Sequence, residues 1–424
     1  MPALTEGSLA ASRSLNARLL GYIRSGAAST RGQLADLTGL SRSNIAERVA
    51  ELTSLGLVVE AGTTRSTGGR APVRLELNAR AACVAAVDLS VAGFDVALTD
   101  LDARPLTDRS VDWDIGEGPE ATLTRVEEEI DRLLSDERAR AVAAQPLVGV
   151  GVGFPGPVRF DTARPVSPAG LPDWDDYPLG ERLGARYGVD VRVDNEANMM
   201  AVGEHRLGAA KGVEDFVLIK IGDGIGAGIF SGGRLHRGHL GGSGDIAHIP
   251  VPVDASSAIT CRCGKQSCLT TVADARALGR TATALARDRR SPALRRAADR
   301  SGGPLNARDL MNAALRGDDP SVRALEAAAG HVGRTLAMVV NVLNPELVLL
   351  AGDMMAAADI VLPVVRRTVY AESTPLTTRA LRIERSDPQG HFGITGAAAT
   401  VLDHLLGAER LGDWSAISPV RATR

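Results

Sequence analysis

One histidine and three cysteines stand close together in this sequence and could bind a metal ion. His248 precedes the segment Cys-Arg-Cys-Gly-Lys-Gln-Ser-Cys, which contributes Cys261, Cys263 and Cys268, three of the four cysteines in the chain. One imidazole and three thiolates form the ligand set of a tetrahedral structural Zn²⁺ site, which leaves no position for a reacting water. The alternative is a group of buried or redox-active thiols, and the scarcity of cysteine elsewhere favours zinc.

The composition is that of a soluble protein with more than one domain. The chain has 424 residues, of which 44% are hydrophobic and 23% charged, and this length predicts about two to four domains. It contains no apolar run of about 18 residues, and its first residues lack the basic and then apolar order of a signal peptide. We therefore expect a cytoplasmic protein without a membrane partner, in which thiols stay reduced and free to bind metal.

Positive charge is concentrated near the N-terminus. The net formal charge of the whole chain is −3, yet residues 12–80 contain ten arginines and only five acidic residues. A basic module on an acidic body is the distribution expected when one part of a protein contacts nucleic-acid phosphates and the rest does not. We expect residues 1–80 to bind double-stranded DNA.

The same residues show the pattern of a winged helix-turn-helix. Apolar residues recur at helical spacing between Leu15 and Ile23, a short helix ends at Gly39, and Ser41 can cap a further helix. Apolar side chains on the inner face of that helix leave four polar residues to point outward and contact DNA, namely Arg42, Ser43, Asn44 and Arg48. A three-helix interaction module is the alternative interpretation.

Two strand-like segments follow, at residues 57–60 and 73–77, and they enclose a loop from Ala61 to Pro72. Such a loop is typical of a wing. Arg70 follows two glycines and could enter a narrow minor groove, where the negative potential is greatest. An ordinary hairpin loop is the alternative.

From about residue 81 the pattern changes to alternating strands and helices. Strand-like or helical segments occur at residues 84–89, 95–101, 120–135, 147–154, 216–221, 226–230, 324–343 and 347–352. This alternation predicts an α/β architecture.

An ordered set of motifs runs through this α/β region. The motifs are Val87-Asp88, Gly153-Phe-Pro-Gly-Pro, Asp194-Asn-Glu-Ala-Asn, Gly222-Asp-Gly-Ile-Gly-Ala-Gly, Asp245-Ile-Ala-His and the cysteine cluster. Together with the helix-turn-helix pattern, they resemble the ROK family, named for its repressors, open reading frames and kinases, over nearly the whole chain.

The resemblance implies an α/β actin-like ATPase (ribonuclease H-like) body behind the winged helix. Its two lobes would occupy residues 81–200 and 201–424, with the final helix returning to the first lobe and a sugar bound between the lobes. Family members are often homodimers, so we expect a dimer or tetramer, and a dimeric DNA-binding protein prefers an inverted repeat.

The motifs depart from those of the family's kinases. The first phosphate loop reads Asp88-Leu-Ser-Val-Ala, where kinases carry glycines that let backbone N–H groups approach phosphates. The second places Asp223 where kinases have threonine, and the adenosine end reads Ala351-Gly352-Asp353. The base position is Glu196 instead of aspartate, and a shift of about 1 Å can lower a rate about a hundredfold. We expect a regulator without ATP-dependent catalysis; a sugar kinase with an appended DNA-binding domain is the alternative.

The resemblance places the ligand contacts at Asn195, Glu196, Asp245 and His248. Asp245 is shorter than the glutamate usual in the family, and Gly170 and Thr270 replace two further polar contacts, so a sugar would meet fewer partners. Three outcomes stay open: the cavity binds a sugar or sugar derivative, it binds another small metabolite, or it binds nothing. In the last case the body would only dimerise a constitutive DNA-binding protein.

Overall fold

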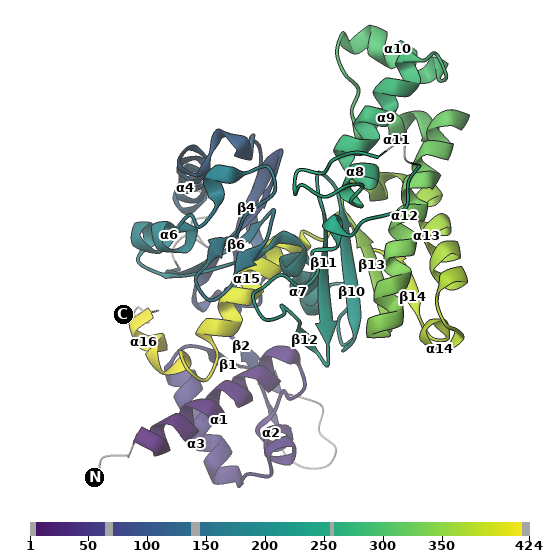
Figure 1. Ribbon diagram of the computed structural model, residues 1–424. Helices are drawn as coiled ribbons and strands as arrows, with labels where there is room; N and C mark the ends of the chain where they lie inside the picture. Colours follow the sequence, from purple (N-terminus) through teal and green to yellow (C-terminus); the bar gives the residue numbers. More distant parts are fainter. Residues whose placement is uncertain (1–5, 64–70, 137–144, 255–257, 418–424) are drawn as a thin grey trace.

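The computed structural model describes residues 6–63, 71–136, 145–254 and 258–417. At the bottom of Figure 1, three helices and a two-stranded antiparallel hairpin form an N-terminal module. Its elements are α1 (Glu6–Ser25), α2 (Arg31–Thr38), α3 (Arg42–Ser54), β1 (Val58–Thr63) and β2 (Val73–Leu77). The hydroxyls of Thr30 and Ser41 accept hydrogen bonds from first-turn N–H groups of α2 and α3, which would otherwise lack partners.

The first lobe is built on a five-stranded sheet in the order β5-β4-β3-β6-β9, in which β6 and β9 run parallel to β3 and the other pairs are antiparallel. The strands are β3 (Cys83–Ser90), β4 (Gly93–Thr99), β5 (Pro105–Asp112), β6 (Leu147–Phe154) and β9 (Asp190–Asn195). One face of the sheet packs on α4 (Pro119–Ser135) and α6 (Leu179–Tyr187), and the other on α7 (Glu196–Leu207) and α15 (Phe392–Leu405).

The second lobe has a five-stranded sheet in the order β12-β11-β10-β13-β14. Its strands are β10 (Phe216–Ile221), β11 (Ile225–Ser231), β12 (Arg234–Leu235), β13 (Leu347–Ala351) and β14 (Arg382–Arg385). Its outer face packs on a group of helices, namely α8 (Thr270–Ala273), α9 (Ala275–Arg287), α10 (Pro292–Ser301), α11 (Ala307–Leu315), α12 (Asp319–Leu343) and α13 (Ala358–Glu372). The short helix α14 (Pro375–Thr378) lies against α12.

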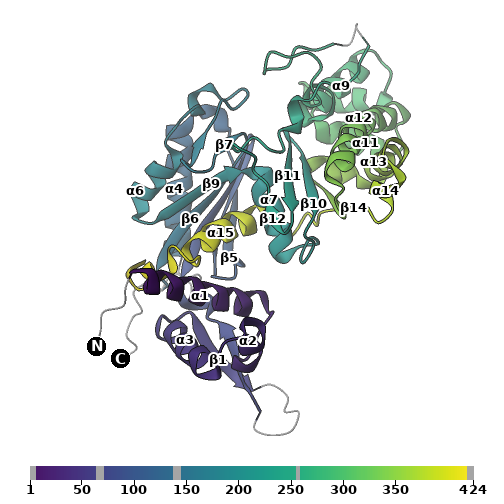
Figure 2. The same ribbon diagram turned by 60° about the horizontal axis from the view of Figure 1, so that its bottom comes forward.

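Helix α7 lies between the two sheets (Figures 1 and 2). Met199 packs into the core of the first lobe, while Ala201 packs with Phe216 and Leu347 of the second. The lobe boundary predicted at residues 200 and 201 therefore falls inside one helix. The helix begins at Glu196, within the Asp194-Asn-Glu-Ala-Asn motif, and continues until Leu207, with Gly208 as its C-cap.

Helix α15 returns from the second lobe and lies against β3 and β6 of the first (Figure 1). Its close approach to β6 and α7 requires glycine at two positions. A Cβ on Gly151 of β6 would lie 2.1 Å from the carbonyl oxygen of Ala397, and a Cβ on Gly396 would lie 1.6 Å from that of Met199 on α7. The backbones of α7 and α15 are thus in direct contact. Downstream, Leu411 and Trp414 are buried in the same core as the N-terminal module, and α16 (Trp414–Ile417) follows.

Two predicted helical regions differ in detail. The helix predicted at 324–343 begins earlier, at Asp319, because the carboxylate of Asp318 accepts a hydrogen bond from Ser321 N–H. The Ala- and Arg-rich stretch from 277 to 317 is divided into α9, α10 and α11. None of the described helices combines the length and apolar character that a bilayer crossing requires.

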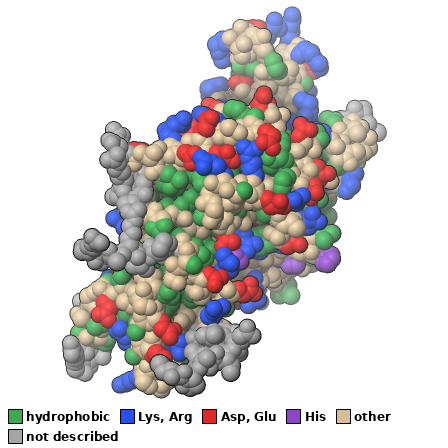
Figure 3. Space-filling view, turned by 90° about the vertical axis from the view of Figure 1, so that its left-hand side faces the viewer, with side chains coloured by type: hydrophobic (Ala, Val, Ile, Leu, Met, Phe, Trp, Pro, Cys, Tyr) green, Lys and Arg blue, Asp and Glu red, His purple; other side chains and the backbone are tan. Residues whose placement is uncertain are grey.

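Basic and acidic side chains are interspersed on the face of the molecule shown in Figure 3, without a large area of one sign on the first lobe. Ion pairs between α6 and α4 are of this kind, with Arg182–Glu127 at 3.0 Å and Arg186–Asp131 at 2.5 Å. Exposed pairs contribute little to stability individually.

Candidate functional site

The four predicted metal ligands lie together in space. Their ligand atoms all lie within 4.8 Å of one another, with His248 Nδ1 3.4 Å from Cys261 Sγ and Cys263 Sγ 3.6 Å from Cys268 Sγ. A tetrahedral Zn²⁺ ion with bonds of about 2.0–2.3 Å holds its ligand atoms about 3.4–3.8 Å apart. Both pairs have this separation, so the described side chains fit a metal ion of that size.

The loop around the cluster is folded so that the ligands converge. Gly264 adopts the left-handed conformation (φ +86°) and donates its N–H to the carbonyl of Cys261, while Cys261 N–H bonds to Lys265 O. His248 ends a short 3₁₀ helix (Ile246–His248). Burial raises the pKa of Cys268 to about 12, so a bound cation is required to keep this sulfur as a thiolate at neutral pH.

Next to this cluster, a cavity of about 620 Å³ opens between the lobes, and the four predicted ligand contacts line it. They come from different elements: Asn195 and Glu196 stand at the start of α7, whereas Asp245 and His248 belong to the segment after β12. Asp245 is exposed. A second cavity of about 1130 Å³ adjoins the first, since both are lined by Asp88, Asp223, Arg276 and Asp353.

Asn195 fixes the start of α7 against the Gly-Phe-Pro-Gly-Pro loop. Its Oδ1 accepts from the N–H of Ala197 at 2.9 Å, and its Nδ2 donates to the carbonyl of Gly156, also at 2.9 Å. The preceding residue, Asp194, is buried and accepts from Arg237 Nε at 2.6 Å. The N-terminus of α7 is therefore held rigidly at the wall of the cavity.

Sequence reasoning missed Lys220, which occupies the centre of this site. Its ammonium group donates to Glu196 Oε2, and the two side chains are only 17% and 12% exposed. The carboxylate at the base position is thus already ion-paired, and a substrate hydroxyl would have to compete with Lys220 for it. A lysine within the otherwise apolar strand Phe-Val-Leu-Ile-Lys-Ile was the available signal.

Two carboxylates, those of Asp223 and Asp353, line the phosphate-loop end of the cavity together with Arg276. Burial raises the pKa of Asp223, and the nearby carboxylate of Asp353 raises it further. A Cβ on Gly222 would lie 3.2 Å from Asp353 Oδ2, so this carboxylate reaches the turn itself. Two carboxylates at this position oppose the binding of a triphosphate, because like charges repel more strongly in a partly dehydrated cleft than in water.

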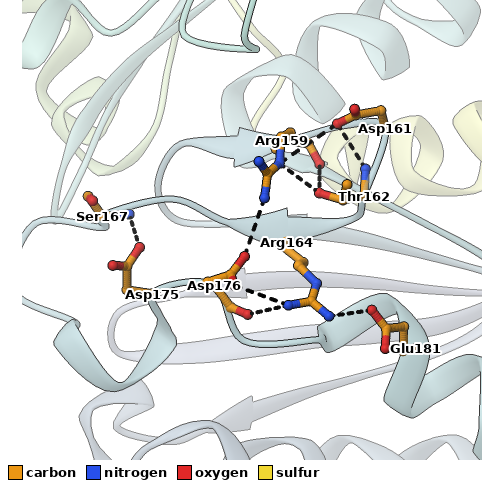
Figure 4. A network of polar contacts seen from close by, with 8 residues as sticks. All are labelled: Arg159, Asp161, Thr162, Arg164, Ser167, Asp175, Asp176 and Glu181. Atoms are coloured by element: carbon orange, nitrogen blue, oxygen red, sulfur yellow. Dashed lines mark hydrogen bonds and ion pairs between the residues drawn. The ribbon is translucent and has the colours of Figure 1, made fainter.

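The loop between Cys261 and Cys263 also reaches the first lobe. A Cβ on Gly170 would lie 2.2 Å from Arg262 Nη1, so only glycine leaves room for this guanidinium. The loop that carries Gly170 is held by polar contacts around β7 (Val158–Arg159) and β8 (Arg164–Pro165). Figure 4 shows these contacts, in which Asp175 accepts from Ser167 N–H at 2.6 Å and Asp176 contacts both Arg159 and Arg164.

The ionisation of Asp88 makes the stability of the folded protein depend on pH. The carboxylate of Asp88 packs against Gly393 of α15, and its Oδ1 has no partner among the described residues. Burial raises its pKa to about 7, although Lys220 acts in the opposite direction. An unfolded chain releases this proton near pH 4, so the folded protein binds more protons between about pH 4 and 7 and loses stability as pH rises through that window.

We therefore expect Asp88→Asn to reduce the pH dependence of stability. Between about pH 5.5 and 7.5 this group should lower the free energy of unfolding of the wild-type protein by about 2 kcal/mol, and the variant should lack that decrease. Urea unfolding at both pH values measures the difference. An equal decrease in both proteins would show that Asp88 is ionised throughout this range.

On the N-terminal module, the predicted DNA contacts are differently exposed. Arg42 and Ser43 are exposed at the start of α3, and Asn44 is half-buried. Arg48 departs from the prediction of an outward side chain: it is 16% exposed, and its Nη1 lies 2.8 Å from Glu51 Oε2 one turn later. The acidic residue draws the guanidinium along the helix. Arg70 lies outside the described residues.

The family model for ROK proteins matches residues 84–404, three quarters of the chain. This chain belongs to the ROK family. It is 28% identical over 379 residues to the putative xylose repressor of Caldicellulosiruptor sp. (strain Rt8B.4), covering 89% of this chain and 92% of that protein. It is 26% identical over 378 residues to the DNA-binding transcriptional dual regulator NagC of Escherichia coli (strain K12), covering 88% of each.

Kinases of the ROK family match a shorter part of the chain. The glucokinase of Halalkalibacterium halodurans is 31% identical over 259 residues, covering 61% of this chain and 76% of that enzyme. The solved structure of a glucokinase from Streptomyces griseus with glucose and AMPPNP covers 75% of this chain, with a TM-score of 0.63 and 26% identity. A solved ROK transcriptional regulator, a homolog of the E. coli MLC protein, covers 96%, with a TM-score of 0.80 and 23% identity, a likeness that shows the fold.

Proposed function

We propose that this ROK protein is a DNA-binding transcriptional regulator, and a repressor in particular, that senses a sugar or related metabolite in the cavity between its lobes. The extent of the likeness carries this proposal: relatives named as repressors match 89% of the chain, whereas the glucokinase matches 61%. A match of 379 residues in a chain of 424 must include at least part of the N-terminal module. The body would be the sensor, and the module would bind DNA.

The N-terminal module supplies the elements of a winged helix-turn-helix. In this interpretation α3 is the recognition helix, with Arg42 and Ser43 at its exposed start, where base edges are contacted in such motifs. Asn44 would contact a base edge or phosphate beside them. Arg48, held by Glu51, would serve a phosphate or orient the helix, and the hairpin would present Arg70 to the minor groove. Binding as a homodimer would select an inverted repeat.

We expect Arg42→Ala to weaken binding to a duplex selected from a random pool by about 1–3 kcal/mol, because each lost base contact costs about that much. Binding to random duplexes should change far less. Fluorescence anisotropy with labelled duplexes measures both affinities. Arg104→Ala is the matched control, since Arg104 forms an ion pair with Asp102 in the first lobe. Equal losses on both kinds of duplex would mean that Arg42 touches only phosphates.

The same titration tests ligand sensing. D-xylose and N-acetylglucosamine are the first probes, because two relatives are named for them. Asp245 lies at the cavity and holds no other side chain in place within the described structure, so Asp245→Ala should remove ligand-induced release while leaving DNA affinity unchanged. Release of the variant at the wild-type sugar concentration would exclude Asp245 from the ligand site.

We further propose that the metal is Zn²⁺ with a structural role. When bound, it would supply positive charge that keeps three thiolates ionised and would fix the loop that carries His248. His248 would ligate through Nδ1, which faces Cys261, and its other ring nitrogen would stay available to a ligand. Catalysis has no part in this proposal, and the alternative of an ATP-dependent sugar kinase is tested below.

A further inference from the structure

A triad of charged side chains joins the N-terminal module to α7 and α15: its two arginines are largely buried, whereas the carboxylate of Asp403 is 54% exposed. Arg24 on the last turn of α1 donates to Asp403 Oδ1 at 2.7 Å, and Arg206 on α7 donates to the same oxygen at 2.5 Å. Asp403 belongs to α15. One carboxylate oxygen therefore holds arginines from two separate helices, one in the module and one in the body.

Among the described residues, Asp403 is the hydrogen-bond partner of the Arg24 guanidinium. The side chain of Arg24 is 7% exposed, and the chain neighbours of Arg24 and Asp403, namely Ile23 and Leu402, belong to the shared apolar core. Nε and Nη2 of Arg24 have no hydrogen-bond partner among the described residues. Burial lowers the pKa of Arg24, while Asp403 opposes that effect. A buried guanidinium with most of its donors unused is easily displaced once its single carboxylate moves, because water would satisfy those donors.

The other end of α7 lies in the cavity. Asn195 caps the helix and Glu196 pairs with Lys220, whereas Arg206 stands in its last turn. The helix cannot slide past α15 independently: a Cβ on Gly203 would lie 2.0 Å from Phe392 O, so the two backbones touch here as they do at Gly396. Backbone contact leaves no flexible side chains to absorb a shift, and packed elements of this kind move between discrete arrangements.

Within the module, the contact continues to α3. Asn16 of α1 donates to Glu51 Oε2 at 2.7 Å, and the same carboxylate holds Arg48. A change in the position of α1 would therefore displace α3, the helix that enters the major groove in the proposed function.

We propose that Asp403 is a positioning residue that couples the ligand cavity to the DNA-binding module through Arg206 and Arg24. The inference rests on the proposed function and specifies how it is regulated. Because α7 and α15 are in backbone contact and Arg206 is paired with Asp403, a ligand that binds one seating of α7 better than another also moves Asp403, and the shared oxygen passes that shift to Arg24. A ligand with equal affinity for both seatings would have no effect.

A double-mutant cycle tests this coupling without a known effector. Asn195→Ala removes the cap at the cavity end of α7, and Asp403→Asn removes the charge at the other end. We expect Asn195→Ala to change the dissociation constant for a pool-selected duplex by about fivefold or more in the wild-type background, the lower range of allosteric coupling. In the Asp403→Asn background the same substitution should change it by less than about twofold.

The matched control is Asp131→Asn, which breaks the ion pair between α4 and α6 and should leave the full effect of Asn195→Ala. Asp403→Glu, which keeps the charge, should restore part of the coupling. If Asp403→Asn does not fold, as judged by thermal unfolding and metal content, Arg206→Met replaces it and breaks the link from the side of α7.

Two results would overturn the coupling while leaving the proposed function intact. One is an equal effect of Asn195→Ala in both backgrounds, and the other is no effect of Asn195→Ala on DNA affinity in the wild-type background. A wild-type protein that selects no duplex from the pool would overturn the proposed function and this inference together.

Discussion

A Cys263→Ser variant is expected to lose the metal and to unfold about 10 °C below the wild-type protein. Cys263 is exposed, so replacing its sulfur changes little packing, and the loss would come from the metal itself. Structural zinc contributes its binding free energy to folding, and a loss of about 3–5 kcal/mol corresponds to a shift of this size in a lobe of this length. Circular dichroism melting and metal analysis of the purified chain measure both quantities.

Lys265→Ala is the control, because Lys265 stands in the same loop and its side chain is not a ligand. Its metal content and melting temperature should stay at the wild-type values. Cysteine thiols must lose their protons to bind a metal ion, so the wild-type protein should release its metal below about pH 5. A metal-free preparation with unchanged melting temperature would refute the structural role.

The second large effect concerns ATP. We expect turnover by the full chain with any hexose to stay far below about 1 s⁻¹, the lower end of typical enzyme rates. Two features of the cavity predict this result: Lys220 pairs with the carboxylate at the base position, and Asp223 and Asp353 occupy the phosphate-loop end. A coupled assay of ADP formation across a panel of sugars makes the measurement.

A variant that restores only the aspartate of the kinases at the base position makes the test more specific. Glu196→Asp alone should not produce activity, because Lys220 would still face the shorter carboxylate and the glycine-poor loop after Asp88 would stay unchanged. The glucokinase of Halalkalibacterium halodurans is the positive control for the assay. Wild-type turnover near 1 s⁻¹ with a hexose would instead establish the kinase alternative and would make the N-terminal module an addition to an enzyme.

The spacing of residues along the sequence was sufficient to predict features that are formed by residues close together in the chain. The cysteines within eight residues, the cap at Ser41 and the alternation of strands with helices were all predicted from neighbours along the chain, and the ligand atoms converge as predicted. Contacts between distant elements were not predictable. Lys220 and Glu196 are separated by 24 residues and Arg24 and Asp403 by 379, and no periodicity connects them.

Arg48 illustrates a different limit. Helical spacing correctly excluded it from the buried face that holds Ile45 and Val49, but spacing alone does not say whether a long side chain extends into solvent or folds along its helix. Glu51, one turn later, pairs with the guanidinium of Arg48 and keeps it along the helix, and Asn16 on α1 donates a hydrogen bond to that glutamate. Such outcomes depend on three residues from two helices at once.

The core that α15 shares with the N-terminal module affects how the chain is made. Leu19 and Ile45 are buried together with Leu402, Leu411 and Trp414. During translation at about 5–20 residues per second, α15 leaves the ribosome on the order of 20–80 s after α1. Until then the apolar surfaces of the module lack part of their covering. A product of interrupted synthesis would therefore carry an exposed apolar face of the kind that aggregates and is bound by chaperones.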